Sequence, residues 1–188
     1  MEQTQATPMK RQVKATEKRG LSTQDLILIA VLLAAGAVLK LTLGSVLTFA
    51  GMKPNFIIAM YCLAILLTRP KPLQALIVGL IAGLICQIPM LNATPWLNIP
   101  SETLGALVMG LLILIPMKVS NFDLNPIVAT FLATVVSGYT FVLILASLNG
   151  IALNVALITY AVMVFGTATF NAILVEILII PLRKVLKK

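Results

Sequence analysis

The chain has 188 residues, of which 60% are hydrophobic and 11% are charged, and its formal net charge is +8. This composition excludes a water-soluble globular domain, because a chain of this length cannot bury so much apolar surface. The positive charge does not indicate nucleic-acid binding, since the basic residues lie in loops and at the chain ends and form no stripe on a water-facing surface.

Several kinds of chemistry are missing from the sequence. Histidine is absent, and Cys62 and Cys86 lie inside apolar runs without a CxxC spacing, which excludes histidine acid–base catalysis and the common zinc sites. We expect both cysteines to be packing residues. The sequence also lacks a GxxxxGK[ST] loop and an HExxH motif. We therefore expect no enzyme activity, no cofactor and no ATP hydrolysis by this chain itself.

The beginning of the chain differs in character from the rest. Residues 1–22 are polar and carry five basic residues without apolar periodicity, which predicts a disordered basic tail in the cytosol. The remaining residues, 23–188, are predicted to form one membrane domain that binds a substrate. Ser22 or Thr23 can cap its first helix.

Apolar runs joined by short polar or proline-rich segments predict an all-α bundle of six membrane helices. The second run has only fourteen residues, short of the ~20 that span a bilayer. The sixth has 29 residues and at about 1.5 Å per residue exceeds a ~30 Å hydrocarbon core, so it must tilt or protrude. The predicted helices cover about 25–43, 55–68, 73–89, 101–117, 125–148 and 153–181, with a polar loop at 118–124.

The distribution of basic residues predicts the orientation of the bundle. With the N-terminus in the cytosol, 12 of the 14 basic residues lie on the cytosolic side, and only Lys40 and Lys53 lie outside. If the short second run did not cross, Arg69 and Lys71 would move outside and the balance would worsen. The count therefore predicts six crossings with both termini in the cytoplasm.

Charges outside the cytosolic loops are functional candidates, because a charge near the bilayer is costly. Lys53 lies in the first outer loop, and Glu102 opens the fourth helix after a proline-rich outer segment. The two charges could simply snorkel to the headgroups and favour a helix N-terminus. Alternatively, they converge with nearby polar and aromatic residues on a small zwitterionic ligand. The predicted substrate-binding residues are Met52, Lys53, Asn92, Trp96, Asn98 and Glu102.

Two further features allow more than one interpretation. Glu176 lies in the cytosolic half of the sixth helix, where it can pair with a basic residue near the helix end or take part in ion coupling. The first helix carries Ala30, Ala34 and Ala37, and small residues at this spacing let another helix approach closely. That helix can belong to this chain or to a partner.

Four short stretches carry a resemblance to a known family. They are Gly36-Ala37-Val38-Leu39, Gly51-Met52-Lys53-Pro54-Asn55, Gly79-Leu80-Ile81-Ala82-Gly83-Leu84 and Asn98-Ile99. They resemble the small bacterial TrpP-like tryptophan-uptake proteins, a family similar to the substrate-binding S components of energy-coupling factor (ECF) transporters. The likeness covers about 26–110. One departure is Ser101-Glu102, which stands where the family commonly has a basic residue.

The resemblance implies a six-helix S-component fold in the bacterial cell membrane that binds one small nutrient, most simply tryptophan, near its outer face. It also implies two kinds of partner, a transmembrane coupling subunit and two cytosolic ATPase subunits, with the first-helix alanines facing the coupling subunit. Two alternatives stay open, an S component for a vitamin or another small nutrient, and an ion-coupled secondary transporter that uses Glu176.

Overall fold

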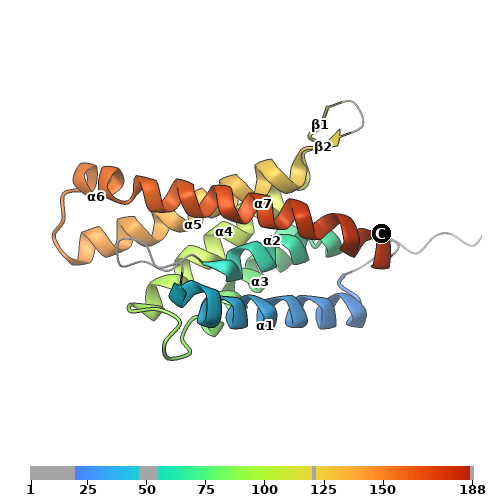
Figure 1. The fold of residues 1–188 in the computed structure, drawn as a ribbon, viewed down its shortest axis with the longest axis horizontal. Coiled ribbons are helices and arrows are strands. Elements are labelled where there is room, and N and C mark those ends of the chain that lie inside the picture. Colours follow the sequence, from blue (N-terminus) through green and yellow to red (C-terminus); the bar gives the residue numbers. More distant parts are fainter. Residues whose placement is uncertain (1–19, 47–54, 120–121, 187–188) are drawn as a thin grey trace, which may run out of the picture.

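A computed structural model describes residues 20–46, 55–119 and 122–186. Its long helices run in alternating directions along a bundle (Figure 1). The prediction of a helical bundle is confirmed. The elements are α1 (Thr23–Val46), α2 (Phe56–Thr68), α3 (Pro72–Ile85), the short 3-10 helix η1 (Pro95–Leu97), α4 (Asn98–Leu112), β1 (Lys118–Val119), β2 (Phe122–Asp123), α5 (Asn125–Leu148), α6 (Leu153–Thr159) and α7 (Ala161–Leu186).

Local sequence signals place several helix ends. The Ser22 hydroxyl accepts a hydrogen bond from the Asp25 amide at 3.2 Å, and the Asp25 carboxylate accepts one from the Ser22 amide at 3.1 Å. This reciprocal pair satisfies donors that the first turn of α1 leaves unpaired. Prolines stand in the first turns of α3 and α5, where a missing N–H costs nothing. The predicted start of α1 is confirmed to within two residues, and residues 1–19 of the predicted tail lie outside the described residues.

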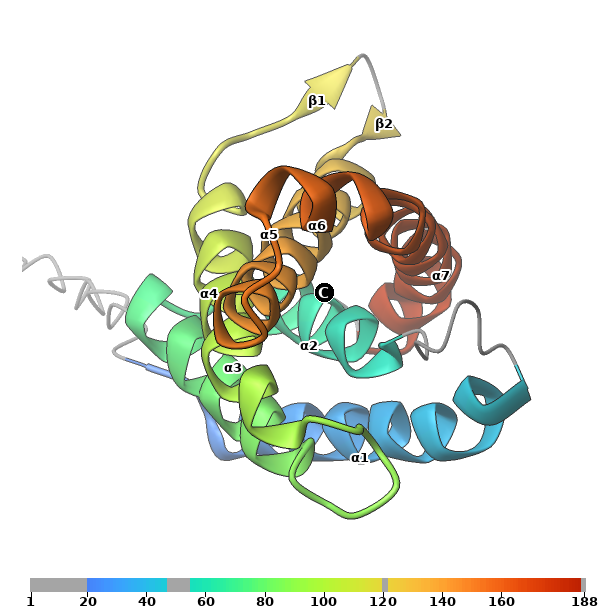
Figure 2. The same ribbon diagram turned by 90° about the vertical axis from the view of Figure 1, so that its left-hand side faces the viewer.

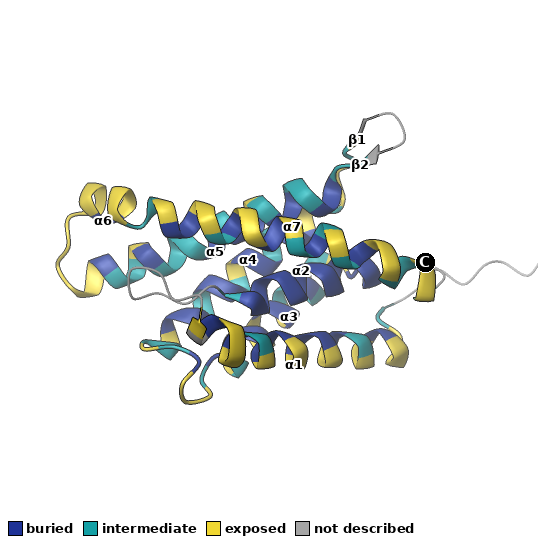
Figure 3. Ribbon diagram, viewed as in Figure 1, coloured by how far each residue is buried: buried dark blue, intermediate teal, exposed yellow. Residues whose placement is uncertain are grey.

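The shortest predicted crossing is the central helix of the bundle. Every residue of α2 is buried, and α1, α3, α4, α5 and α7 surround it (Figures 2 and 3). Its 13 residues make a helix about 20 Å long, too short to span a hydrocarbon core alone. Because the surrounding helices shield it, α2 does not have to match the thickness of the lipid. A helix that is apolar on all sides is typical of this buried position.

Small residues let α3 and α4 pack closely. A Cβ atom at Gly79 would lie 2.6 Å from the Ala106 Cβ, and one at Gly83 would lie 2.7 Å from the Ile99 Cα. The second contact is with backbone, which cannot rotate away. Glycine is therefore required at position 83 for the observed separation of the two helices.

We expect Gly83→Ala to destabilise the protein by about 1–3 kcal/mol, because the added methyl group must push α3 away from α4. Thermal unfolding of the detergent-purified protein measures the change. Gly166→Ala is the matched control, since a Cβ there meets no atom within 4 Å. Equal melting temperatures for the two variants would contradict the close α3–α4 contact.

The later part of the chain differs from the prediction in three places. Helix α4 spans Asn98–Leu112 and so starts and ends earlier than the predicted 101–117. The predicted polar loop at 118–124 contains the antiparallel β1–β2 pair. The predicted single helix at 153–181 breaks at Tyr160 into α6 and α7. The break does not remove the excess length of the sixth run, because α7 alone has 26 residues and at about 1.5 Å per residue still exceeds a ~30 Å hydrocarbon core, so it must tilt or protrude.

The outer surface of the bundle is apolar. Within the described residues, three helices are long and apolar enough to cross a membrane, namely Thr23–Gly44, Asn125–Leu148 and Ala161–Leu186. Their outward side chains include Ile27, Val31 and Ile177, which are 59%, 59% and 62% exposed. A soluble protein does not present such a continuous apolar surface to water. The structure is that of a membrane protein built as a helical bundle.

Candidate functional site: a charged cavity at one end of the bundle

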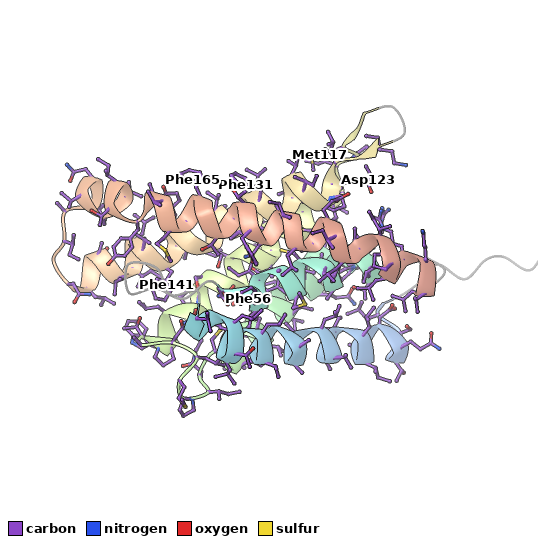
Figure 4. All side chains as sticks on the ribbon, viewed as in Figure 1. Phe56, Met117, Asp123, Phe131, Phe141 and Phe165 are labelled. Carbon is purple, nitrogen blue, oxygen red and sulfur yellow. The ribbon has the colours of Figure 1, made fainter. Side chains whose placement is uncertain are left out.

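A cavity of about 70 Å³ opens between the helices at the end of the bundle where α1 finishes and α2 and α4 begin. Phe141, which marks this end, lies far from Asp123 at the opposite end (Figure 4). The cavity is lined by residues of α1, α2, α4, α5, α7 and the α3–α4 connection: Lys40, Asn55, Ile58, Asn92, Asn98, Ser101, Glu102, Thr134, Ser137, Gly138, Phe141, Met163, Val164 and Thr167.

Lys40 supplies the positive charge of the cavity. It lies on α1 and is only 1% exposed. In the amide orientation that its neighbours favour, the Asn92 side-chain oxygen accepts hydrogen bonds from Lys40 Nζ at 2.9 Å and from Asn98 Nδ2 at 2.7 Å. Lys40 Nζ also lies 3.8 Å from Cys86 Sγ. One side of the cavity therefore presents an ammonium group beside two amides.

Glu102 supplies the negative charge. It lies in the first turns of α4 and is 1% exposed. Asn55 Nδ2 donates a hydrogen bond to one of its carboxylate oxygens, and Ser137 Oγ donates to the other at 3.2 Å. A buried carboxylate needs such donors, because it has lost its hydration. The second side of the cavity therefore presents a carboxylate oriented by α2 and α5.

The two charges belong to one electrostatic unit. Lys40 and Glu102 carry opposite charges and line the same small cavity. In a low-dielectric bundle, an isolated charge of either sign would cost several kcal/mol or more. Each residue therefore makes the burial of the other tolerable.

Asn171 connects the negative side of the cavity to α7. Its Nδ2 donates to the Asn55 backbone oxygen at 3.3 Å and approaches Thr134 Oγ1 at 3.5 Å. Within the described residues, the side-chain oxygens of Asn55 and Asn171 are buried without a hydrogen-bond partner. A buried acceptor that lacks a donor destabilises the protein. These two oxygens can therefore still accept a hydrogen bond from an N–H or O–H group of a ligand.

An apolar wall completes the cavity. Ile58, Phe141, Met163 and Val164 line it from α2, α5 and α7. Aromatic and thioether side chains favour contact with an apolar or aromatic group. A cation, an anion and an apolar wall together can hold a small molecule that carries both charges and one apolar substituent.

The structure brings together three of the residues that the sequence predicted for this site. Asn92, Asn98 and Glu102 all line the cavity. Trp96 is not among the described residues that line it and is 51% exposed, so its role as an aromatic wall stays a prediction. Trp96 lies in η1, which carries the ring outward while the next residues enter α4. Met52 and Lys53 lie outside the described residues.

Neither the cation of the cavity nor most of its residues from distant helices were predicted from the sequence. Lys40 was counted only as an outer charge, although it stands inside the first apolar run, and an ionisable residue within a membrane helix is itself a signal of function. Asn55 closes the Gly51–Asn55 stretch directly before an apolar run, but nothing in that stretch assigned it a binding role. Ser137 and Thr134 carry no signal in the sequence, because small hydroxyl residues are common in membrane helices.

The three alanines of α1 do not share one environment. Ala30 and Ala34 are exposed, whereas Ala37 is 9% exposed and packs in the core of this chain. The face of α1 that is open to another helix therefore contains Ala30 and Ala34. Ala30 also lines an apolar groove between α1 and α3.

Comparison of the chain with protein-family models, with curated proteins and with solved structures gave no match.

Proposed function

We propose that this chain is the substrate-binding S component of an ECF-type importer and that it captures a free amino acid, tryptophan above all, at the outer face of a bacterial cell membrane. The observation that carries the proposal is the buried cavity in which Lys40 and Glu102 present opposite charges. A free amino acid is a small zwitterion, and its two charged groups match this pair. The resemblance to tryptophan-uptake proteins supports the choice of ligand.

The proposed orientation has six crossings and both termini in the cytoplasm. The cavity then faces outward, and Arg69, Lys118 and Arg183, which gather at the opposite end, face the cytosol. This arrangement agrees with the preference for basic residues on the cytoplasmic side. The buried helix α2 counts as one of the six crossings.

In the proposed complex, the ligand carboxylate lies against Lys40 and the two amides beside it, and the ammonium group lies against Glu102 and Asn55. The unpartnered Asn55 oxygen offers a further acceptor to the ammonium group. The cavity of about 70 Å³ suits the charged end of an amino acid, and the indole ring lies toward its mouth beside Phe141 and Met163. The ligand therefore uses a deeper site than the outer loops suggested.

The chain needs partners to move its ligand. It contains no phosphate-binding loop, so the proposed energy source is ATP hydrolysed by two ATPase subunits that act through a transmembrane coupling subunit. The exposed face of α1 around Ala30 and Ala34 is the proposed contact with that subunit.

This proposal predicts that uptake into proteoliposomes requires the partner subunits and ATP. Ala34→Phe is expected to reduce uptake at least about tenfold while ligand affinity stays unchanged, because a bulky ring separates two closely packed helices. Ala35→Phe is the control, since Ala35 is exposed on the same helix but about 100° around its axis. Accumulation of tryptophan against a gradient by this chain alone would overturn the importer assignment.

A second candidate is an ion-coupled secondary transporter. Two carboxylates of the helical bundle favour it, Glu102 in the cavity and Glu176, one of whose oxygens is buried without a hydrogen-bond partner among the described residues. Carboxylates within membrane helices are typical of proton and ion pathways. Uptake by the isolated chain that follows an imposed proton gradient would support this candidate.

A further inference from the structure

A second hollow, of about 450 Å³, lies at the end of the bundle opposite the charged cavity. Its basic residues come from three separate segments, Arg69 from the end of α2, Lys118 from β1 and Arg183 from the last turns of α7. Among the described residues that line the hollow, Asp123 is the one carboxylate, so these residues together carry a net charge of +2. Like charges that converge in this way repel one another unless an anion neutralises them.

A helix cap, an ion pair and a strand pairing fix the positions of these basic residues. Arg69 caps α2 in the left-handed conformation, with φ of 46°, and its N–H donates to the Ile65 oxygen at 2.9 Å. Glycine is the residue that favours this conformation, and a side chain there costs about 1 kcal/mol or more. Arg183 donates to Asp123 at 3.2 Å, and Lys118 stands opposite Asp123 in the β1–β2 pair. These contacts therefore keep the three basic residues around the hollow.

Apolar residues line part of the hollow, and an exposed apolar stripe on α7 ends close to it in sequence. Leu66 and Leu67 are among the lining residues. On α7, Ile173, Ile177 and Ile180 are 55%, 62% and 52% exposed and recur at a spacing of four and three residues, with Arg183 three residues further on. Residues at this spacing share one helix face. An anion that carries a long apolar chain can therefore occupy the hollow and the isoleucine stripe together.

We propose that this hollow binds the phosphate headgroup of an anionic phospholipid, with one acyl chain along the isoleucine stripe of α7. Arginine and lysine are the side chains that bind phosphate most strongly, and a basic pocket between membrane helices at the lipid headgroup level is a lipid site by its chemistry. A free phosphate ion matches the three basic residues equally well but leaves the isoleucine stripe unused. The inference does not depend on the ligand of the charged cavity.

The test titrates phosphatidylglycerol into the detergent-purified full-length protein and counts bound lipid by native mass spectrometry. Phosphatidylcholine and inorganic phosphate are titrated in parallel. We expect retention of phosphatidylglycerol, at least about tenfold weaker retention of phosphatidylcholine, and no competition by inorganic phosphate at equal concentration. Competition by inorganic phosphate at equal concentration would overturn the lipid assignment, because the acyl chain would then contribute nothing.

Variants locate the site. Arg69→Gln with Arg183→Gln is expected to weaken phosphatidylglycerol binding at least about tenfold, and Arg69→Gln alone, which keeps the Arg183–Asp123 pair, to weaken it about three- to tenfold. The matched control is Lys71→Gln with Lys184→Gln, which removes the same charge from the same end of the bundle at residues outside the hollow. An equal loss in the control would show a general charge effect and overturn the proposal.

Discussion

Lys40→Met is expected to lower the stability of the protein by about 3–5 kcal/mol, because it leaves the Glu102 carboxylate buried without its cation. Glu102→Gln in the same chain is expected to restore much of that loss, since the double variant contains no uncompensated charge. Thermal unfolding of the detergent-purified single and double variants measures this coupling. The attraction between opposite charges that are buried around the same cavity is the physical reason for the recovery.

The double variant also separates stability from binding. It is expected to fold nearly as well as the wild type but to bind tryptophan at least about a hundredfold more weakly, because both charged contacts with the ligand are gone. Strictly additive losses in the two single variants, with no recovery in the double variant, would show that Lys40 and Glu102 do not compensate each other.

Glu102→Gln alone is expected to weaken tryptophan binding by roughly ten- to a hundredfold. Glutamine keeps the size of the side chain, so the main change is the lost charge, and a charge-assisted hydrogen bond contributes about 1.5–3 kcal/mol. Calorimetry with the purified variant measures the affinity.

Glu176→Gln is the matched control for this prediction, because it makes the same substitution in another helix of the bundle, at a residue that does not line the cavity. Its affinity for tryptophan should equal that of the wild type. Similar losses in both variants, or no loss in Glu102→Gln, would remove the ammonium contact from the proposed site.

Much of the helical framework was predictable because its signals are local. Apolar runs, the Ser22–Asp25 pair and the Asn125-Pro126 step act within a few residues of each helix end. The short α2 run was read as a weak crossing, since helix length was compared with bilayer thickness alone. Its central position depends on packing between distant segments, which a local pattern does not contain.

The site was predictable in part for the same reason. Asn92, Asn98 and Glu102 are close in sequence and could be grouped around one outer segment. Lys40, Asn55 and Ser137 reach the cavity only because α1, α2, α4 and α5 pack together. Trp96 is equally close in sequence but is 51% exposed and is not among the described lining residues, because closeness in sequence does not fix the direction of a side chain.

We propose that the Lys40–Glu102 cavity recognises both charges of an amino acid. Calorimetry on the wild-type protein tests it most directly with tryptophan, with tryptamine, which lacks the carboxylate, and with indole-3-propionate, which lacks the ammonium group. We expect tryptophan to bind and each analogue to bind at least about tenfold more weakly, because one charge of the cavity is left unmatched. Binding of either analogue as tightly as tryptophan would contradict it.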